Sequence, residues 1–312
     1  MIQLNGIFPP LPTSFDQDEN LALDKMRTNI EKLISFDFRG FLVLGSNGEL
    51  VHLSEAEKIQ VYEMAREVIT PEKLMIAGTG GQSTRETIML TRAAAAAGAD
   101  AALVLNPFYF KGLMKPEALK QHYFAVADVS PIPVIIYNMP ANSGMDMDAD
   151  TLFMLSEHPN ITGLKDSGGN VAKMGDIRKR VKPEFQILAG SAGFLVPAMS
   201  VGACGGILAS ANIAPAQCIA MHKAFTAGDM AEASRLQLDI IPVNNAVTKK
   251  WGVPALKAAM DYIGLYGGPA RKPLFPLDAD TKAELRKILD DYNIKSNLNE
   301  TKTFNDSWPH RI

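Results

Sequence analysis

The sequence predicts an α/β chain that folds as a (β/α)₈ TIM barrel with a C-terminal helical extension. The 312 residues exceed the roughly 250 that one such barrel needs. Eight short apolar runs bounded by Gly, Pro or Asp also alternate with longer segments of helical period, which is typical of repeated βα units. The predicted strands run from Asn5 to Phe8, Gly40 to Leu44, Leu74 to Ala77, Ala101 to Leu105, Val134 to Tyr137, Ile161 to Leu164, Gln186 to Ala189 and Gly206 to Ala209.

Capping residues mark the helices between these strands. Ser54 opens a capping box ahead of a helix ending near Val68, and Ser83 opens a second helix that continues to Ala97. Gly98 then follows as a C-terminal cap. Beyond the eighth strand only helices are predicted: Pro215 to Ala227, Met230 to Val247, Lys250 to Ile263 and one after Asp278. We therefore predict a barrel over residues 1–212, a helical extension packed on it over residues 213–294, and a polar, loosely ordered tail over residues 295–312.

Composition narrows the class of protein. The net charge of -3 and the scattered Lys and Arg provide no basic surface for a nucleic acid. Neither a secretory signal nor an apolar stretch of about 18 residues is apparent, so we expect a soluble, cytoplasmic protein without membrane contact. The cysteines at 204 and 218 and the histidines at 52, 122, 158, 222 and 310 lack the spacing of metal ligands. No metal and no cofactor are expected.

Polar residues close several of the predicted strands, where barrel enzymes place their chemistry. Lys165 follows a buried run, and burial favours the neutral amine, which can attack a ketone. Tyr137 lies one βα unit earlier, so its phenol should project beside Lys165 and could relay protons. The alternatives are a solvated or salt-bridged lysine and a half-buried aromatic with a wet hydroxyl.

The turn from Gly45 to Glu49 offers backbone N–H groups and small polar side chains, an arrangement suited to a carboxylate. A merely tight turn is the alternative. Glu49 and Asp166 are candidate general bases by position, although carboxylates at strand ends often only bind loop amides.

Five motifs at strand ends occur in a fixed order: Gly45-Ser46-Asn47-Gly48-Glu49, Tyr137-Asn138-Met139-Pro140, Gly163-Leu164-Lys165-Asp166, Gly190-Ser191 and Gly206-Ile207. From about Gly6 to Asp291 the chain thereby resembles the dihydrodipicolinate synthase / N-acetylneuraminate lyase superfamily of class I pyruvate aldolases. The resemblance implies a barrel with C-terminal helices and a homotetramer built as a dimer of dimers.

The resemblance also implies roles for individual residues. Lys165 would be the Schiff-base lysine and Tyr137 the proton relay, with Ser46 and Asn47 binding the substrate carboxylate. Tyr109 would enter the neighbouring subunit and complete a hydroxyl relay with Tyr137 and Ser46. Further substrate contacts are expected from Ser167, Asn142, Gly190 and Ile207.

Departures from the family pattern indicate the branch. Dihydrodipicolinate synthases carry an arginine at the position of Asn142 and a Thr-Thr pair at Ser46-Asn47, and a neutral amide cannot replace a bidentate guanidinium. The positions for lysine feedback, here Leu50, Val51, Glu55 and Phe108, also lack the usual residues, so feedback inhibition is not expected. The stretches Lys165 to Gly169, Ala189 to Phe194 and Asn244 to Thr248 resemble the 4-hydroxy-2-oxoglutarate aldolase branch.

We therefore predict cleavage of a 4-hydroxy-2-oxo acid, most simply 4-hydroxy-2-oxoglutarate, to pyruvate and glyoxylate. The first alternative is dihydrodipicolinate synthesis from pyruvate and aspartate semialdehyde. Aldol cleavage or dehydration of a 2-oxo-3-deoxy sugar acid, or deamination of a hydroxyproline-derived ring, is the second. A catalytically silent barrel that senses an oxo acid or serves in an assembly is the third.

Overall fold

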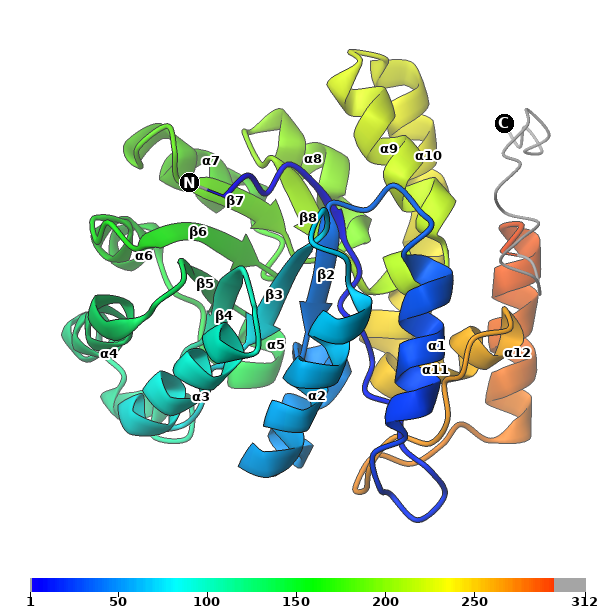
Figure 1. Cartoon of the computed structure of the whole chain (residues 1–312). Coiled ribbons are helices and arrows are strands. Elements are labelled where there is room, and N and C mark those ends of the chain that lie inside the picture. Colours follow the sequence, from blue (N-terminus) through cyan, green and yellow to red (C-terminus); the bar gives the residue numbers. More distant parts are fainter. Residues whose placement is uncertain (1, 295–312) are drawn as a thin grey trace.

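Eight parallel strands form the centre of the computed structural model, which describes residues 2–294 (Figure 1). The strands from β2 to β8 pair with one another in chain order, and β1 pairs with β8. A bridge between Pro10 and Leu42 brings the chain after β1 to β2 and nearly closes the barrel. The strands are β1 (Gly6–Phe8), β2 (Gly40–Val43), β3 (Leu74–Gly78), β4 (Ala101–Leu105), β5 (Val134–Asn138), β6 (Ile161–Asp166), β7 (Gln186–Ala189) and β8 (Gly205–Ile207).

The predicted fold class is confirmed, and every strand end lies within two residues of its predicted position. Strand β8 begins one residue and ends two residues earlier than predicted, whereas β6 continues past Leu164 to include Lys165 and Asp166. The strand can include these two polar residues because each side chain is buried against a partner: Lys165 against the Tyr137 ring and Asp166 against Lys173.

Helices cover the outside of the strands (Figure 1). Ser54 and Glu57 form the predicted capping box, Ser83 caps the next helix, and Gly98 after its end has a φ of +92°. The helices around the barrel are α1 (Leu23–Leu33), α2 (Glu55–Val68), α3 (Thr84–Ala96), α4 (Pro116–Val129), α5 (Pro140–Ser143), α6 (Ala149–Ser156), α7 (Val171–Arg180) and α8 (Leu195–Ser200).

The extension consists of α9 (Pro215–Thr226), α10 (Met230–Asn245), α11 (Gly252–Tyr262) and α12 (Ala279–Asp291). The break predicted near Val247 is instead a π-helical turn over Ala246–Lys250 that continues α10. It follows Pro242, which has no N–H for the helical ladder, and a wider turn accommodates the missing bond. The predicted tail over residues 295–312 lies outside the described residues.

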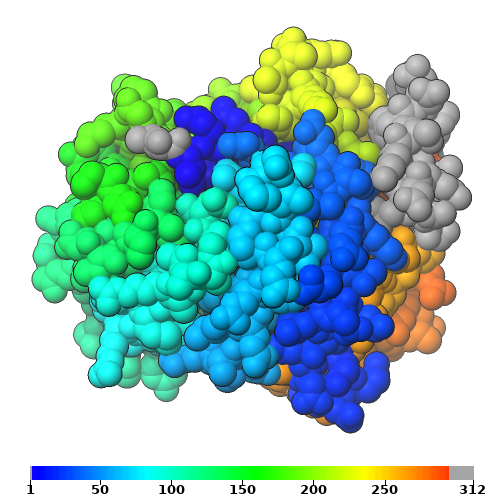
Figure 2. Space-filling model, viewed as in Figure 1, coloured from blue at the N-terminus to red at the C-terminus, as the bar shows by residue number. Residues whose placement is uncertain are grey.

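The extension packs against the first helix. In the space-filling view the orange C-terminal segment lies beside the blue N-terminal one (Figure 2). Asn29 of α1 donates to the carbonyl of Tyr266 at 2.7 Å, and Lys32 donates to that of Gly264 at 2.7 Å. Among residues 2–294 no helix is long and apolar enough to cross a membrane.

Two apolar layers follow from the alternation of side chains along the strands. Residues such as Val43, Ile136 and Leu164 pack outward against the helices. Others, including Leu103 and Ile135, fill the barrel interior. Tyr137 belongs to the interior layer, which places its side chain at the carboxyl end of the barrel.

Candidate active site

A cavity of about 400 Å³ opens at the carboxyl ends of β2 to β5, where the sequence predicts the site. This volume suits a small molecule. Its walls are mainly apolar, and its polar side chains are Ser46, Tyr137 and Asn142. The other lining residues are Leu44, Gly45, Leu50, Val51, Gly78, Leu103, Leu105 and Phe108.

Lys165 lies against Tyr137. The register of β5 and β6 pairs these two residues directly, so both side chains leave the sheet on the same face. Lys165 Nζ is 4.1 Å from the centroid of the Tyr137 ring, within the range of a cation–π contact. Only 3% of Lys165 and 4% of Tyr137 is exposed. A primary amine thus lies in the barrel interior beside a phenol, as the sequence predicts.

Ser46 connects Tyr137 to the turn after β2. The hydroxyl oxygens of Ser46 and Tyr137 are 3.2 Å apart and share a hydrogen bond. Leu44 and Glu49, on either side of the turn, both have left-handed backbones, with φ of 57° and 53°. Such conformations are uncommon outside glycine and cluster at functional sites. The hydroxyl pair and the strained turn place polar groups at the edge of the cavity.

Asn47 is half-buried beside Ser46, and its side chain is not part of the cavity lining. Asn142 does line the cavity, from the short helix α5 that follows β5. Ile207 is buried in the barrel interior at the end of β8. The structure therefore brings Asn142 to the cavity with Ser46 and Tyr137, whereas Asn47 and Ile207 are not among the lining residues.

Ser167 and Gly190 are in contact where β6 and β7 end. The Ser167 N–H donates to the Asn138 carbonyl at 2.9 Å, and the Gly190 N–H donates to that of Asp166 at 2.7 Å. A Cβ at Gly190 would lie 2.0 Å from Ser167 Oγ, which is closer than real atoms approach. Gly190 is therefore a glycine because the Ser167 side chain occupies the adjacent space.

Tyr109 is separate from this group within the chain. It is 76% exposed, packs edge-on against Phe110, and is not part of the cavity lining. The N–H groups of Phe108 and Tyr109 both donate to Gln82 Oε1, at 3.1 and 3.0 Å, which fixes the loop after β4. The expected contact of Tyr109 with a neighbouring subunit stays a prediction.

Glu49 has a structural role, because its carboxylate is bound by residues of the C-terminal extension. Its carboxylate pairs with Lys257 of α11 at 2.7 Å, with each side chain 1% exposed, and accepts the backbone N–H of Arg271 at 2.9 Å. Burial lowers the pKa of Lys257, and the ion pair with Glu49 partly opposes that shift. The Arg271 guanidinium pairs with Glu57 and lowers the pKa of that carboxyl to about 2. The turn after β2 is thus attached to the extension.

Asp166 is also engaged away from the cavity. Its carboxylate accepts from Asn138 Nδ2 at 3.0 Å and from the Gly168 N–H at 2.7 Å, and it pairs with Lys173 at 3.1 Å. For both Asp166 and Glu49 the structure therefore agrees with the alternative weighed from the sequence, carboxylates bound by neighbouring groups. The sequence analysis did not identify the partners Asn138, Lys173 and Lys257. Of these, only Asn138 could have been singled out from the sequence, because it lies in the motif that contains Tyr137.

The histidines within residues 2–294 contact different parts of the fold, and His222 Nε2 lies 3.2 Å from the carbonyl oxygen of Cys204. His52 contacts Glu49, His122 contacts Thr84, and His158 contacts Asp128. Burial raises the pKa of the thiols of Cys204 and Cys218 to about 12 in both cases. Within residues 2–294 no three side chains of His, Cys, Asp or Glu gather as metal ligands do. Independence of metal and cofactor stays a prediction.

Fold and site together define a class of protein, a (β/α)₈ barrel with a buried lysine and a tyrosine on neighbouring strand ends beside a small cavity. Comparison with known proteins identifies the family. The chain belongs to the Dihydrodipicolinate synthetase family, whose model matches residues 3–292. The resemblance inferred from the strand-end motifs is confirmed.

Relatives carry more than one activity in their names. A 4-hydroxy-tetrahydrodipicolinate synthase of Methanoculleus marisnigri is 34% identical over 287 residues, covering 91% of this chain and 98% of the relative. A probable mitochondrial 4-hydroxy-2-oxoglutarate aldolase of Emericella nidulans is 36% identical over 287 residues, covering 90% and 93%. Both names describe enzymes, and the comparison leaves the substrate of this chain open between them.

Solved structures agree with the fold. A dihydrodipicolinate synthase from Bacillus anthracis is 31% identical with a TM-score of 0.89, covering 93% of this chain and 99% of that one. A prophage protein of the dihydrodipicolinic acid synthase family from E. coli K12, solved in complex with pyruvate, is 30% identical with a TM-score of 0.88, covering 94% and 100%.

The contact between Gly190 and Ser167 predicts the effect of adding one methyl group. Gly190→Ala should destabilise the protein by about 1–3 kcal/mol, because overpacking forces the Ser167 side chain and the Asp166 carbonyl to move. Gly112→Ala is the matched control, since a Cβ there meets no atom within 4 Å. Urea unfolding of both variants gives the free energies, and equal stabilities would contradict the assignment.

Proposed function

We propose that this protein is a class I, Schiff-base aldolase that cleaves a 4-hydroxy-2-oxo acid, most simply 4-hydroxy-2-oxoglutarate, to pyruvate and glyoxylate. One observation carries the proposal: the buried amine of Lys165 lies against Tyr137, whose hydroxyl is hydrogen-bonded to Ser46 at a small cavity. A nucleophilic amine and a proton relay are the two groups that this chemistry requires.

The reaction begins when Lys165 Nζ attacks the C2 ketone and loss of water gives an iminium ion. Tyr137 accepts the proton of the C4 hydroxyl, the C3–C4 bond breaks, and its electron pair moves into an enamine while glyoxylate leaves. Protonation of the enamine at C3 and hydrolysis of the imine release pyruvate and restore the amine. In this proposal Tyr137 and its hydrogen-bonded partner Ser46 carry the proton transfers.

The remaining residues fit roles in binding. Ser46 and Asn47, in the turn after β2, would hold the carboxylate next to the ketone, and Ser167 at the end of β6 would hold the distal one. Tyr109, 76% exposed in the single chain, suits a role in trans within a homotetramer, where it would extend the Ser46–Tyr137 relay. Gly190 supports Ser167 by leaving room for its side chain. The enzyme would act in the cytoplasm on small oxo acids without a metal or cofactor.

Asn142 supports the choice of substrate. It lines the cavity and carries no charge, whereas dihydrodipicolinate synthases have an arginine at this position for the carboxylate of the aldehyde. The second candidate is condensation of pyruvate with aspartate semialdehyde, which is favoured by the names of relatives such as the Methanoculleus synthase. Both candidates use the same Schiff base on Lys165.

Borohydride trapping tests the Schiff base. Pyruvate plus sodium borohydride should inactivate the enzyme and add the mass of a reduced pyruvyl group to the peptide containing Lys165, because only an imine is reduced to a stable amine. Lys165→Arg keeps the charge but cannot form the imine, and it should take up no label. Peptide mass spectrometry locates the adduct, and a wild-type protein left unlabelled would overturn the proposal.

Removing the phenol tests the proton relay. Tyr137→Phe should lower kcat for pyruvate release about 10²–10⁴-fold, the usual contribution of a positioned proton-transfer group. Borohydride labelling of Lys165 should persist because the ring still lies over the amine. Ser46→Ala removes only the partner hydroxyl and should cost less than Tyr137→Phe. A Tyr137→Phe enzyme with unchanged kcat would exclude the relay.

The substrate is tested by two assays run side by side. The wild-type protein should release pyruvate from 4-hydroxy-2-oxoglutarate with a higher kcat/KM than it shows for condensation with aspartate semialdehyde. Asn142→Arg should raise the semialdehyde reaction about tenfold, since a charged hydrogen bond contributes roughly 1.5–3 kcal/mol. Asn142→Gln controls for size. Preference of the wild type for the semialdehyde would favour the second candidate.

A further inference from the structure

Strand β6 changes phase just before the lysine. Val134 of β5 pairs with Ile161, but the next residue of β5, Ile135, pairs with Gly163. Thr162 is therefore an extra residue, a β-bulge, in the strand that carries Lys165. A Cβ at Gly163 would lie 2.7 Å from the carbonyl oxygen of Gln186 on β7, so only glycine allows the strands this approach.

The phase change decides where Lys165 points. Ile161 and Leu164 both belong to the apolar layer between strands and helices, whereas Lys165 lies in the barrel interior over Tyr137. Regular alternation from Ile161 would place Lys165 on the same face as Ile161, under the helices. The apolar pattern of β6 accepts either phase, because the layers on both faces are apolar.

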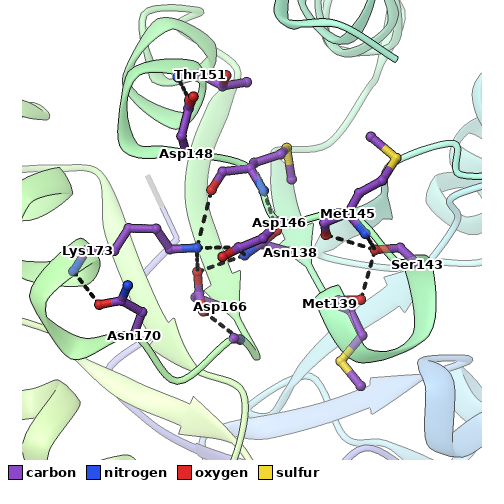
Figure 3. A network of polar contacts seen from close by, with 12 residues as sticks. Asn138, Met139, Ser143, Met145, Asp146, Asp148, Thr151, Asp166, Asn170 and Lys173 are labelled. Carbon is purple, nitrogen blue, oxygen red and sulfur yellow. Dashed lines mark hydrogen bonds and ion pairs between the residues drawn. The ribbon is translucent and has the colours of Figure 1, made fainter. Parts of the chain in front are cut away.

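A polar network beyond the bulge selects the observed phase (Figure 3). Asn138 follows Tyr137 on β5, Asp166 follows Lys165 on β6, and the register pairs Asn138 with Asp166. Asn138 Nδ2 donates to Asp166 at 3.0 Å and to Asp146 at 2.7 Å. Lys173 of α7 contacts both carboxylates, at 3.1 Å from Asp166 and 2.5 Å from Asp146.

This network can exist only in one register. Asp166 is fully buried and the Lys173 side chain is 9% exposed, so the ion pair compensates two charges that have lost most of their water. A slip of one residue would turn Asp166 into the barrel and Lys165 toward the helices. It would also take the carboxylate away from Asn138 and Lys173, because Lys165 or Ser167 would then lie opposite Asn138.

We infer that Asn138, Asp166 and Lys173, hereafter the strand-end clamp, are positioning residues that aim Lys165 at Tyr137. The clamp touches the two reactive residues only through the backbone, at the peptide bonds after Tyr137 and Lys165. The expected effect of the clamp on turnover rests on the proposed function, whereas its expected effect on the orientation of the Lys165 side chain is independent of that function.

The first test variant changes the clamp residue on α7, Lys173, and so leaves the sequence of the two strands unchanged. Lys173→Met keeps the length of the side chain and deletes the charge, whereas Lys173→Arg restores the charge. Lys58→Met is the matched control, because Lys58 has an 8% exposed side chain paired with Glu86 and lies outside the site. Asn138→Leu is a second clamp variant of similar size. The readouts are kcat and KM, the rate of borohydride labelling at Lys165 with pyruvate, the unfolding midpoint, and crystal structures.

Lys173→Met and Asn138→Leu should lower kcat and the labelling rate about 10²-fold, the cost of misplacing a reacting group by about 1 Å, with a smaller change in KM. Their crystal structures should show Lys165 Nζ farther than 4.1 Å from the Tyr137 ring. Lys173→Arg should recover most of the rate, and Lys58→Met should keep it even if its midpoint falls equally.

Wild-type kcat and an unmoved Lys165 in both clamp variants would overturn the inference. The inference would also be overturned if Lys58→Met lost as much activity as the clamp variants for the same fall in unfolding midpoint. If the wild-type protein itself takes up no label, the proposed Schiff base fails. The Nζ-to-ring distance in the crystal structures then still decides whether the clamp positions Lys165.

Discussion

The parallel pairing of β5 with β6 is the interaction on which the site depends. It sets Tyr137 opposite Lys165 and, one residue later, Asn138 opposite Asp166. Successive residues of a strand point to opposite faces, so the first pair faces the barrel interior and the second faces the helices. One register therefore produces both the Tyr137–Lys165 pair and the buried polar network next to it. The bulge at Thr162 shifts the pairing of β6 by one residue, so that Lys165 faces the barrel interior even though Ile161 faces the helices.

The C-terminal extension also contributes to the site. Glu49, at the end of the turn that carries Ser46, pairs with Lys257 and accepts the Arg271 N–H, both from the extension. Phe15 lies under the two cations, with Lys257 Nζ at 4.6 Å and the Arg271 guanidinium at 4.3 Å from its ring. A buried carboxylate with this set of partners leaves the turn little freedom. The geometry of the Ser46–Tyr137 hydroxyl pair thus depends on residues far along the chain.

Family membership and substrate are separate questions in this fold. Relatives of nearly equal similarity are named for synthesis with a semialdehyde and for cleavage of 4-hydroxy-2-oxoglutarate. The features that such enzymes would share, Lys165 and Tyr137, lie on strands. Asn142, which lines the cavity, lies on the short helix α5 after β5. A residue there can therefore differ between relatives without a change in the strands.

The sequence by itself determined the eight strands, the caps at Ser54 and Ser83, and the positions of Lys165 and Tyr137 at strand ends, because periodicity and capping are local properties. It did not determine the direction of Lys165, since the apolar residues of β6 fit either phase. Only the tertiary structure decided this, through Asp166, Asn138 and Lys173, which three separate elements bring together. The role of Glu49 was also decided by the tertiary structure, because its partner Lys257 is distant in the sequence and only the fold brings the two side chains together.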